Sequence, residues 1–241
     1  MKISVITPSF NSGKTLERAI QSVVKQSYQN WEHLVVDGNS TDNTAELLKK
    51  YPHVKSVSED DKGQSDAMNK GFEMSTGELI LYLNADDELH PEALTNFSKT
   101  FKANPSADMV VADVKVVKED GKSSIDTPTV SLSKILFYWP CKFPLNPVSY
   151  CYRRAVQTYI GHFPVDNHLT MDYWFLVRAF LDFKIKKANF IGGVFYFSVN
   201  NKSADAERAR ISLKQVRDSF VKRYFYRSQV IKFIFRRLYG R

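Results

Sequence analysis

Cysteine and long apolar runs are both scarce in this chain. Its 241 residues contain only Cys141 and Cys151, which form neither a disulfide framework nor a metal-ligand pattern. The N-terminal segment MKISVITPSF is typical of a strand that breaks at Pro8, not of a signal peptide, and no segment is apolar over the length that a bilayer requires. These absences predict a cytoplasmic protein.

Excess basic charge is absent from most of the chain. The net charge is +8, but residues 202–241 alone hold 12 Lys or Arg against 3 Asp or Glu, whereas residues 1–201 hold 22 against 23. The body of the protein therefore lacks the extended basic surface that binds nucleic acid. With 43% hydrophobic and 25% charged residues, the composition suits one large globular domain or two small ones.

Glycine is missing where two common phosphate-binding motifs need it. A dinucleotide-binding GxGxxG should follow the first strand, but PSFNSG offers one glycine there. The segment SGKT at 12–15 resembles the end of a P-loop, whose first glycine would stand at Pro8. A nucleotidyltransferase usually carries a glycine-rich loop with Arg or Lys at this place, and TPSFNSGKT lacks that pattern.

The first half does contain a regular alternation of strands and helices. Hydrophobic patterning predicts strands at 2–10, 31–38, 53–60, 77–84 and 107–117, and helices at 12–26, 40–51, 63–75 and 90–104. This alternation predicts an α/β fold with a mostly parallel sheet flanked by helices, in which ligands bind beyond the carboxyl ends of the strands. Farther along we expect a helix at 170–182, two strands around Gly192 and Gly193, and one long helix from Ser203 onward.

Polar segments follow four of these strands and should converge on one edge of the sheet: TPSFN at 7–11, DGNS at 37–40, EDDKGQSD at 59–66 and NADD at 84–87. The adjacent acids Asp86 and Asp87 repel each other and resist desolvation, so a structural reason for them is required. A divalent cation would stabilise such acids and bridge them to a diphosphate. The alternative is that the pair only caps the helix that begins near Pro91.

Four segments, taken in order, resemble the hallmark segments of family 2 glycosyltransferases with the GT-A fold. They are VITPSFN, VVDGNSTDNT, KGQSDAMNKGFEMSTGELILYLNADDEL and MDYWFLVRAF. The resemblance covers roughly the first 200 residues and is strongest to bacterial enzymes of surface-polysaccharide assembly. It implies a Rossmann-like domain at 1–201, with a nucleotide-sugar-binding half at 1–105 and an acceptor half at 106–201.

The resemblance also implies a nucleotide-sugar donor, usually a uridine diphosphate sugar, together with Mg²⁺ or Mn²⁺. When the family's motifs are matched to this sequence, Thr7, Pro8 and Asn11 are implied to line the nucleotide, and Asp37 is implied to accept a hydrogen bond from the uracil ring. Asp66 is implied to lie near the nucleotide. Asp86 is implied to contact the ribose or the metal region, and Asp87 is implied to ligate the metal. One departure concerns the metal site. Asn84 stands where the family often has an acid, and it carries no charge toward a cation.

Asp172 matches the family's catalytic base, although Met171 precedes it where many members have an acid. An acceptor hydroxyl is a weak nucleophile until a group such as a carboxylate takes its proton. The alternative is that Asp172 is only an acid at a helix N-terminus, where it interacts favourably with the helix dipole.

Residues 202–241 form a basic, amphipathic C-terminal helix in this interpretation. A helical wheel places Phe220, Tyr224, Ile231, Phe235 and Leu238 on one side, with most of the cations elsewhere. We favour contact with an anionic membrane surface. The alternatives are packing on the helix's own domain, packing on a second copy in a homodimer, and nucleic-acid binding, for which the neutral body offers no surface.

Together with the charge pattern of the tail, the resemblance implies an inverting, metal-dependent glycosyltransferase in the cytoplasm, at the inner face of the cell membrane. It would move a sugar from a nucleotide diphosphate donor to a glycan or lipid-linked acceptor in polysaccharide biosynthesis. Two other classes stay open, namely a non-catalytic nucleotide- or sugar-binding protein on the same fold and a nucleotidyltransferase.

Overall fold

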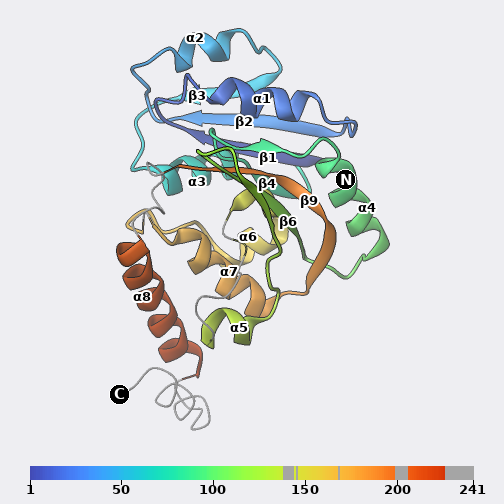
Figure 1. Ribbon diagram of the computed structural model, residues 1–241, viewed down its shortest axis with the longest axis vertical. Helices are drawn as coiled ribbons and strands as arrows, with labels where there is room; N and C mark the ends of the chain where they lie inside the picture. The colour runs from blue at the N-terminus through green and yellow to red at the C-terminus, as the bar shows by residue number, and fades with distance from the viewer. Residues whose placement is uncertain (138–143, 145, 168, 199–205, 226–241) are drawn as a thin grey trace.

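A mixed sheet with helices on both faces forms the centre of the molecule (Figure 1). The computed structural model describes residues 1–137, 144, 146–167, 169–198 and 206–225. The sheet has the strand order β3-β2-β1-β4-β8-β6-β9-β5, and β7 pairs with β6 beside this path. The α/β fold expected from the sequence is therefore confirmed.

The N-terminal half of the sheet is parallel. It consists of β1 (Ile3–Ser9), β2 (Trp31–Asp37), β3 (Val54–Ser58) and β4 (Leu79–Tyr82). The helices α1 (Leu16–Val24), α2 (Thr44–Lys49) and α3 (Gln64–Met74) connect these strands. In the register of the sheet Ser9 lies opposite Asp37, and Ile6 lies opposite Tyr82. The carboxyl ends of β1, β2 and β4 thus meet at one edge.

The second half adds antiparallel pairs. Strand β8 (Tyr150–Arg153) runs antiparallel to β4 and to β6 (Met109–Lys118), while β9 (Ile185–Phe197) runs parallel to β6. The short strands β5 (Glu88–Leu89) and β7 (Ser123–Asp126) complete the sheet. The remaining helices are α4 (Ala93–Ala103), α5 (Leu132–Phe137), α6 (Arg154–Ile160), α7 (Met171–Asp182) and α8 (Ala206–Phe225), with a 3₁₀ turn at Pro147–Ser149.

The continuous apolar run of β4 is buried on both faces of the sheet. Leu79 and Leu81 belong to a cluster with Ala19, Phe97 and other residues of α1 and α4. Ile80 and Tyr82 point the other way, into a cluster that includes residues of α3, α6, α7 and α8. A strand covered on both sides needs apolar residues at every position, because successive side chains alternate between the faces.

The two strands expected around Gly192 and Gly193 are one strand, β9, so that prediction is wrong. The two glycines lie within the strand because neighbouring backbone leaves no room for side chains. A Cβ atom on Gly192 would collide with the Val148 carbonyl oxygen, and one on Gly193 with the Glu88 carbonyl oxygen. Here glycine marks a close approach of backbones, not a turn.

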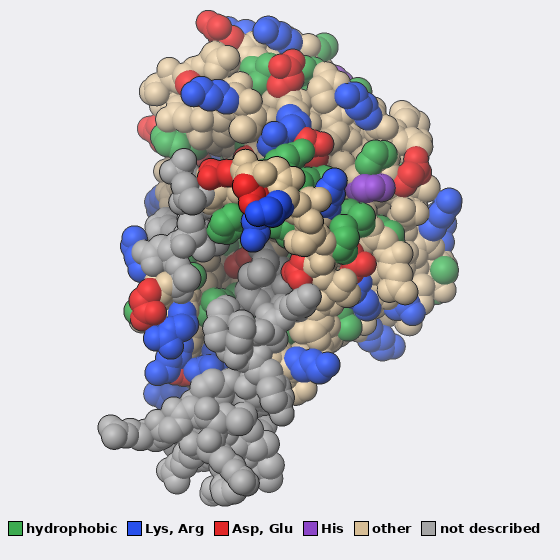
Figure 2. Space-filling view, viewed as in Figure 1, with side chains coloured by type: hydrophobic (Ala, Val, Ile, Leu, Met, Phe, Trp, Pro, Cys, Tyr) green, Lys and Arg blue, Asp and Glu red, His purple; other side chains and the backbone are tan. Residues whose placement is uncertain are grey.

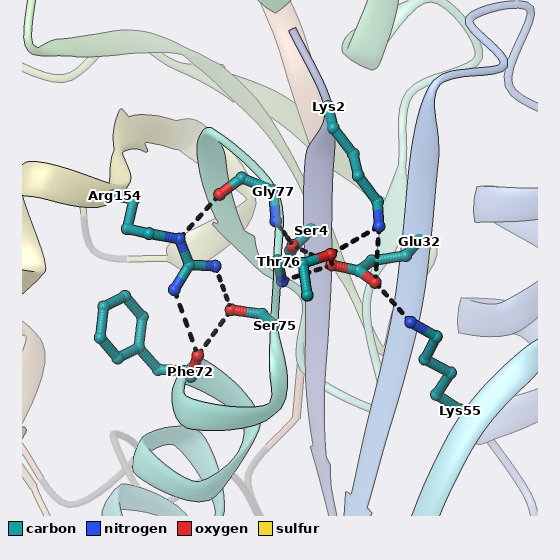
Figure 3. A network of polar contacts seen from close by, with 9 residues as sticks. All are labelled: Lys2, Ser4, Glu32, Lys55, Phe72, Ser75, Thr76, Gly77 and Arg154. Carbon is teal, nitrogen blue, oxygen red and sulfur yellow. Dashed lines mark hydrogen bonds and ion pairs between the residues drawn. The ribbon is translucent and has the colours of Figure 1, made fainter.

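A network of polar contacts connects the amino ends of the parallel strands (Figure 3). Glu32 on β2 is buried and accepts hydrogen bonds from Lys2, Ser4, Lys55 and Thr76, with Lys2 Nζ at 2.9 Å and Lys55 Nζ at 2.8 Å. Burial alone would raise the pKa of Glu32, but these hydrogen bonds outweigh it and hold the pKa well below its usual range. The network anchors the edge of the sheet opposite the carboxyl ends.

The described part of the C-terminal segment is the helix α8, which packs against α7. Its apolar residues Leu213, Val216 and Phe220 are buried in the cluster that contains α7. This arrangement is the one expected if the tail packs on its own domain, and it removes Phe220 from the apolar face proposed for membrane contact. The residues Ile231, Phe235 and Leu238 lie outside the described residues.

The outer side of α8 is basic. Lys214, Lys222 and Arg223 are exposed, and Figure 2 shows Lys and Arg side chains along the edge of the molecule where α8 lies. In the part of the chain that the structure describes, no helix combines the length and the hydropathy that crossing a membrane requires.

Candidate active site

A cavity of about 680 Å³ opens at the carboxyl ends of the parallel strands. Its walls from the first half include Pro8, Phe10, Asn11, Asp61, Asn84 and Asp86. Its walls from the second half include Asn146, Met171 and Asp172. Segments far apart in the sequence thus enclose one space, as the positions of the strand ends led us to expect.

The loops after β1 and β2 hold each other in place beside the cavity. The Asn11 amide Oδ1 accepts from the Thr41 backbone N–H at 2.9 Å, and the Ser40 hydroxyl accepts from the Asn11 N–H at 2.7 Å. Asn11 and Asn39 have positive φ angles of 49° and 60°, a left-handed conformation that asparagine tolerates better than most residues. Pro8 and Asn11, both predicted to contact the nucleotide, therefore lie on a well-defined wall.

Thr7 and Asp37 lie behind that wall and are fully buried. The Thr7 hydroxyl is 2.9 Å from His33 Nε2. The Asp37 carboxylate accepts from the Ser40 N–H at 3.0 Å and from the Ser58 hydroxyl at 2.7 Å, and it also accepts from the Ser40 hydroxyl. These bonds fix the turn that carries Gly38 into the cavity.

Asp66 is in the first turn of α3 and is not part of the cavity wall. It accepts from the Lys62 backbone N–H at 3.1 Å and lies 3.5 Å from the Lys70 ammonium. Its neighbours Asp61 and Gln64 do line the cavity. The acidic segment after β3 therefore reaches the cavity through Asp61, and the expectation that Asp66 lies near the nucleotide stays a prediction.

The adjacent acids after β4 point in different directions. Asp86 lines the cavity, whereas Asp87 is fully buried and does not. Asp87 Oδ2 accepts from the side-chain amides of Asn84 at 3.0 Å and Asn146 at 2.7 Å, and Oδ1 accepts from the Tyr196 N–H at 3.1 Å. The expectation that Asp87 ligates a metal stays a prediction, and the structure places Asp86 nearer to any ligand in the cavity.

The ionised forms of Asp86 and Asp87 are energetically unfavourable at these buried positions. Burial, together with the nearby Asp86 carboxylate, raises the pKa of Asp87 to about 7. Burial also raises the pKa of Asp86. A cation at the cavity wall would relieve this cost, because opposite charge favours the ionised form.

A Mg²⁺ or Mn²⁺ ion fits this wall when a diphosphate shares its coordination. Within the described ranges, no three His, Cys, Asp or Glu side chains are grouped so that they could hold an ion by themselves. Mg²⁺ is commonly held by one or two carboxylates together with phosphate oxygens of a substrate. Asp86 supplies one such carboxylate at the cavity, with the charge of Asp87 behind it.

Asp172 lies on the opposite side of the site, in the first turn of α7. Its Oδ1 accepts from the Tyr173 backbone N–H at 2.7 Å, which fixes the direction of the carboxyl group. Burial raises the pKa of Asp172 to about 7. A carboxyl group with a pKa near neutrality is well suited to accept a proton at physiological pH.

Three cavity residues were not singled out by the sequence. Phe10 is 64% exposed at the wall, Gln64 donates to the Asn84 side chain at 3.0 Å, and Asn146 holds Asp87. An aromatic residue between Pro8 and Asn11 was a usable signal for Phe10. Asn146 gave no such signal, because only the fold brings its loop beneath the end of β4.

The chain matches the family described as Glycosyl transferase family 2 over residues 4–207. It is 32% identical over 143 residues to the poly(ribitol-phosphate) beta-N-acetylglucosaminyltransferase TarP of Staphylococcus aureus, an alignment that covers 56% of this chain and 41% of TarP. Two further curated relatives are covered over 27% and 34% of their lengths. The chain thus spans less than half the length of these three relatives.

Solved structures share the fold. Staphylococcus aureus TarS 1-349 in complex with UDP-GlcNAc superposes with a TM-score of 0.73 and 22% identity, covering 95% of this chain and 74% of that one. A mannosyltransferase from Pyrobaculum calidifontis in complex with GDP-Man and Mn²⁺ gives a TM-score of 0.62 and 21% identity, covering 87% and 60%. These likenesses confirm the expected GT-A fold.

Proposed function

Because this chain belongs to glycosyl transferase family 2, we propose that it transfers a sugar from a nucleoside diphosphate donor to a hydroxyl group of a glycan or lipid-linked acceptor in bacterial polysaccharide synthesis. One observation carries the proposal. A single cavity joins Asp86, at the end of a central strand, to Asp172, at the start of a helix from the other half of the chain. The first carboxylate suits a diphosphate with its cation, and the second suits an acceptor hydroxyl.

The donor lies along the ends of β1, β2 and β4 in this proposal. Phe10 offers an exposed aromatic face to the nucleobase, while Pro8 and Asn11 line the nucleoside. The buried Thr7 and Asp37 support this wall from behind through their bonds to His33, Ser40 and Ser58. The UDP-GlcNAc complex of TarS supports a uridine donor for this chain.

Asp86 faces the diphosphate and its Mg²⁺ or Mn²⁺ ion, and Asp87 adds a second negative charge from behind. A divalent ion bound there neutralises charge on the diphosphate leaving group. Asn84 and Asn146 donate hydrogen bonds to Asp87 and so favour its ionised form without adding charge to the site. The Mn²⁺ complex of the mannosyltransferase neighbour supports this cofactor assignment.

Asp172 acts as the general base. As the acceptor oxygen attacks the anomeric carbon, Asp172 takes the proton of that hydroxyl, and the bond from carbon to the diphosphate oxygen breaks on the opposite face. A new glycosidic bond forms with inverted configuration, and the nucleoside diphosphate leaves with the electron pair. The raised pKa of Asp172 means that it holds the proton more readily than an exposed aspartate would.

A pair of single substitutions tests the donor half. We expect Asp86→Asn to weaken Mn²⁺-dependent binding of UDP about tenfold or more, because the carboxylate at the cavity wall is lost. UDP binding without metal should change little. Asp87→Asn should instead lower the melting temperature, because an amide group would face the three donors that now bond to the carboxylate.

Isothermal titration calorimetry with UDP, with and without Mn²⁺, provides the measurement. If Asp86→Asn binds UDP and Mn²⁺ as tightly as the wild type, the assignment of Asp86 is wrong. If no nucleoside diphosphate binds to the wild type, the proposed function itself is wrong.

A further inference from the structure

Arg18 on α1 reaches the back of the Asp86–Asp87 turn. Its Nη2 donates to the Asp86 carbonyl oxygen at 2.6 Å, and its Nε lies 3.0 Å from Glu88 Oε1 in an ion pair. The guanidinium carbon stacks 3.8 Å from the centre of the Tyr196 ring. One side chain thus contacts the residue before Asp87, the residue after it, and the strand β9.

Tyr196 completes the arrangement from the other side. Its hydroxyl donates to Glu88 Oε1 at 2.8 Å, and its backbone N–H donates to Asp87 Oδ1 at 3.1 Å. We name Arg18, Glu88 and Tyr196 the Arg18 clamp. Three elements, α1, β5 and β9, meet in it around a turn of two residues.

The clamp determines which way the two acids face. A bond to the Asp86 carbonyl oxygen fixes the peptide unit between Asp86 and Asp87, and the bond from Tyr196 fixes the Asp87 carboxylate. With both held, Asp86 is directed to the cavity and Asp87 away from it.

The clamp also fixes the position of the positively charged Arg18 guanidinium group. Arg18 pairs with Glu88, the third acid in the run from Asp86 to Glu88. In the described residues no salt bridge is formed by the carboxylates of Asp86 or Asp87. Arg18 therefore pairs directly with Glu88, and its charge also acts on the Asp86 carboxylate.

We propose that Arg18, acting with Glu88 and Tyr196, is a positioning residue that holds the Asp86–Asp87 turn in the geometry needed for metal-dependent binding of the donor diphosphate. The inference rests on the proposed function, since it assigns the diphosphate and its ion to Asp86. Partners that orient a metal ligand commonly change metal affinity by about 10-fold to 100-fold when they are removed.

Arg154 provides a matched control at the other end of β4. Its Nε donates to the Gly77 carbonyl oxygen at 2.9 Å, its Nη2 donates to the Ser75 hydroxyl at 2.6 Å, and it stacks 4.9 Å from the Phe72 ring centre (Figure 3). Arg154 therefore resembles Arg18 in donating to a backbone carbonyl oxygen and in stacking on an aromatic ring. It holds the segment that enters β4 and not the turn that leaves it.

The test compares Arg18→Met with Arg154→Met in the full chain. We expect Arg18→Met to weaken UDP binding about 10-fold to 100-fold in the presence of Mn²⁺ and to leave metal-free UDP binding nearly unchanged. Arg154→Met should lower the melting temperature and leave both affinities unchanged. Arg18→Lys should recover only part of the lost affinity, because an ammonium group cannot reproduce the planar contacts of a guanidinium group.

Hydrogen exchange gives a readout that needs no ligand. The backbone amides of residues 84–89 should exchange faster in Arg18→Met and at the wild-type rate in Arg154→Met. Equal Mn²⁺-dependent UDP affinity in Arg18→Met and the wild type would overturn the clamp, as would unchanged exchange at 84–89. If Arg18→Met does not fold, Tyr196→Phe keeps the ring and removes the hydroxyl group that bonds to Glu88, and it should weaken the same affinity without altering metal-free binding. Absence of binding of any nucleoside diphosphate to the wild type would instead refute the proposed function.

Discussion

The proposed role of Asp172 as general base predicts how the reaction rate depends on pH. A general base works in its ionised form, and the pKa of Asp172 is raised by burial to about 7. The rate at saturating donor and Mn²⁺ should therefore rise with pH, level off above about 7, and fall about tenfold for each pH unit well below it. A rate that is constant from pH 5 to 8 would contradict the role of Asp172.

The donor affinity must be measured across the same pH range. Burial also raises the pKa of Asp87 to about 7, so protonation there can weaken metal binding as the pH falls. A loss of rate at low pH that saturating donor and Mn²⁺ do not reverse is caused by protonation of Asp172. A loss that they do reverse is caused by protonation of the Asp86–Asp87 pair.

The residue scale also shows the limit of reasoning from sequence. The run of apolar residues before NADD correctly indicated a buried strand that ends at the site. It could not indicate that Asp86 faces the cavity and Asp87 faces inward. That difference depends on Asn146, Tyr196 and Arg18, which come from distant segments of the chain.

At the scale of elements, the parallel strands and β6 were predictable, and several short elements were not. The first four strands and their helices carry strong local patterns, so their order was correct. The short strands β5 and β7 and the helices α5 and α6 were missed, because segments of two to seven residues have little periodicity. The pattern around Gly192 and Gly193 predicts a break instead of one strand, because close backbone packing cannot be recognised from one sequence.

The helix α8 gives a test of how the C-terminal segment is used. Phe220 is only 1% exposed and packs in the cluster that contains α7. Phe220→Ala should therefore lower the free energy of unfolding by about 3–5 kcal/mol. Ile211→Ala on the same helix is the control, because Ile211 is 48% exposed and its loss should cost about 0.5 kcal/mol or less.

Chemical denaturation of the wild type, Phe220→Ala and Ile211→Ala shows whether this face of α8 packs on the domain or is free for another surface. Equal stability of Phe220→Ala and the wild type would mean that this face of the helix is free for another surface, such as an anionic membrane. A selective loss in Phe220→Ala supports packing of this face on the domain and restricts any membrane contact to the basic outer side of α8 and to residues 226–241.

At the scale of the whole molecule, the two halves of the chain contribute different walls of one cavity. The neutral body holds the acids of the cavity, while the excess positive charge lies in residues 202–241. The sequence predicted that the polar ends of the first strands meet at one edge of the sheet, and the cavity lies there. It could not predict the contribution of Asn146, because the loop that carries this residue reaches the cavity only through the pairing of β8 with β4 and β6. The donor and acceptor roles of the two halves stay predictions.

Release of UDP from UDP-sugars is the most direct test of the central claim, which is that this cavity transfers sugars with Asp172 as the base. Purified full-length protein should be incubated with a panel of UDP-sugars and Mn²⁺, and UDP should be quantified with and without Asp172→Asn. We expect the wild type to release UDP from at least one donor, with water replacing the acceptor. Asp172→Asn should bind that donor with nearly unchanged affinity and release UDP about 10²-fold to 10⁴-fold more slowly. Equal rates in the two proteins, or binding without any release by the wild type, would contradict the account.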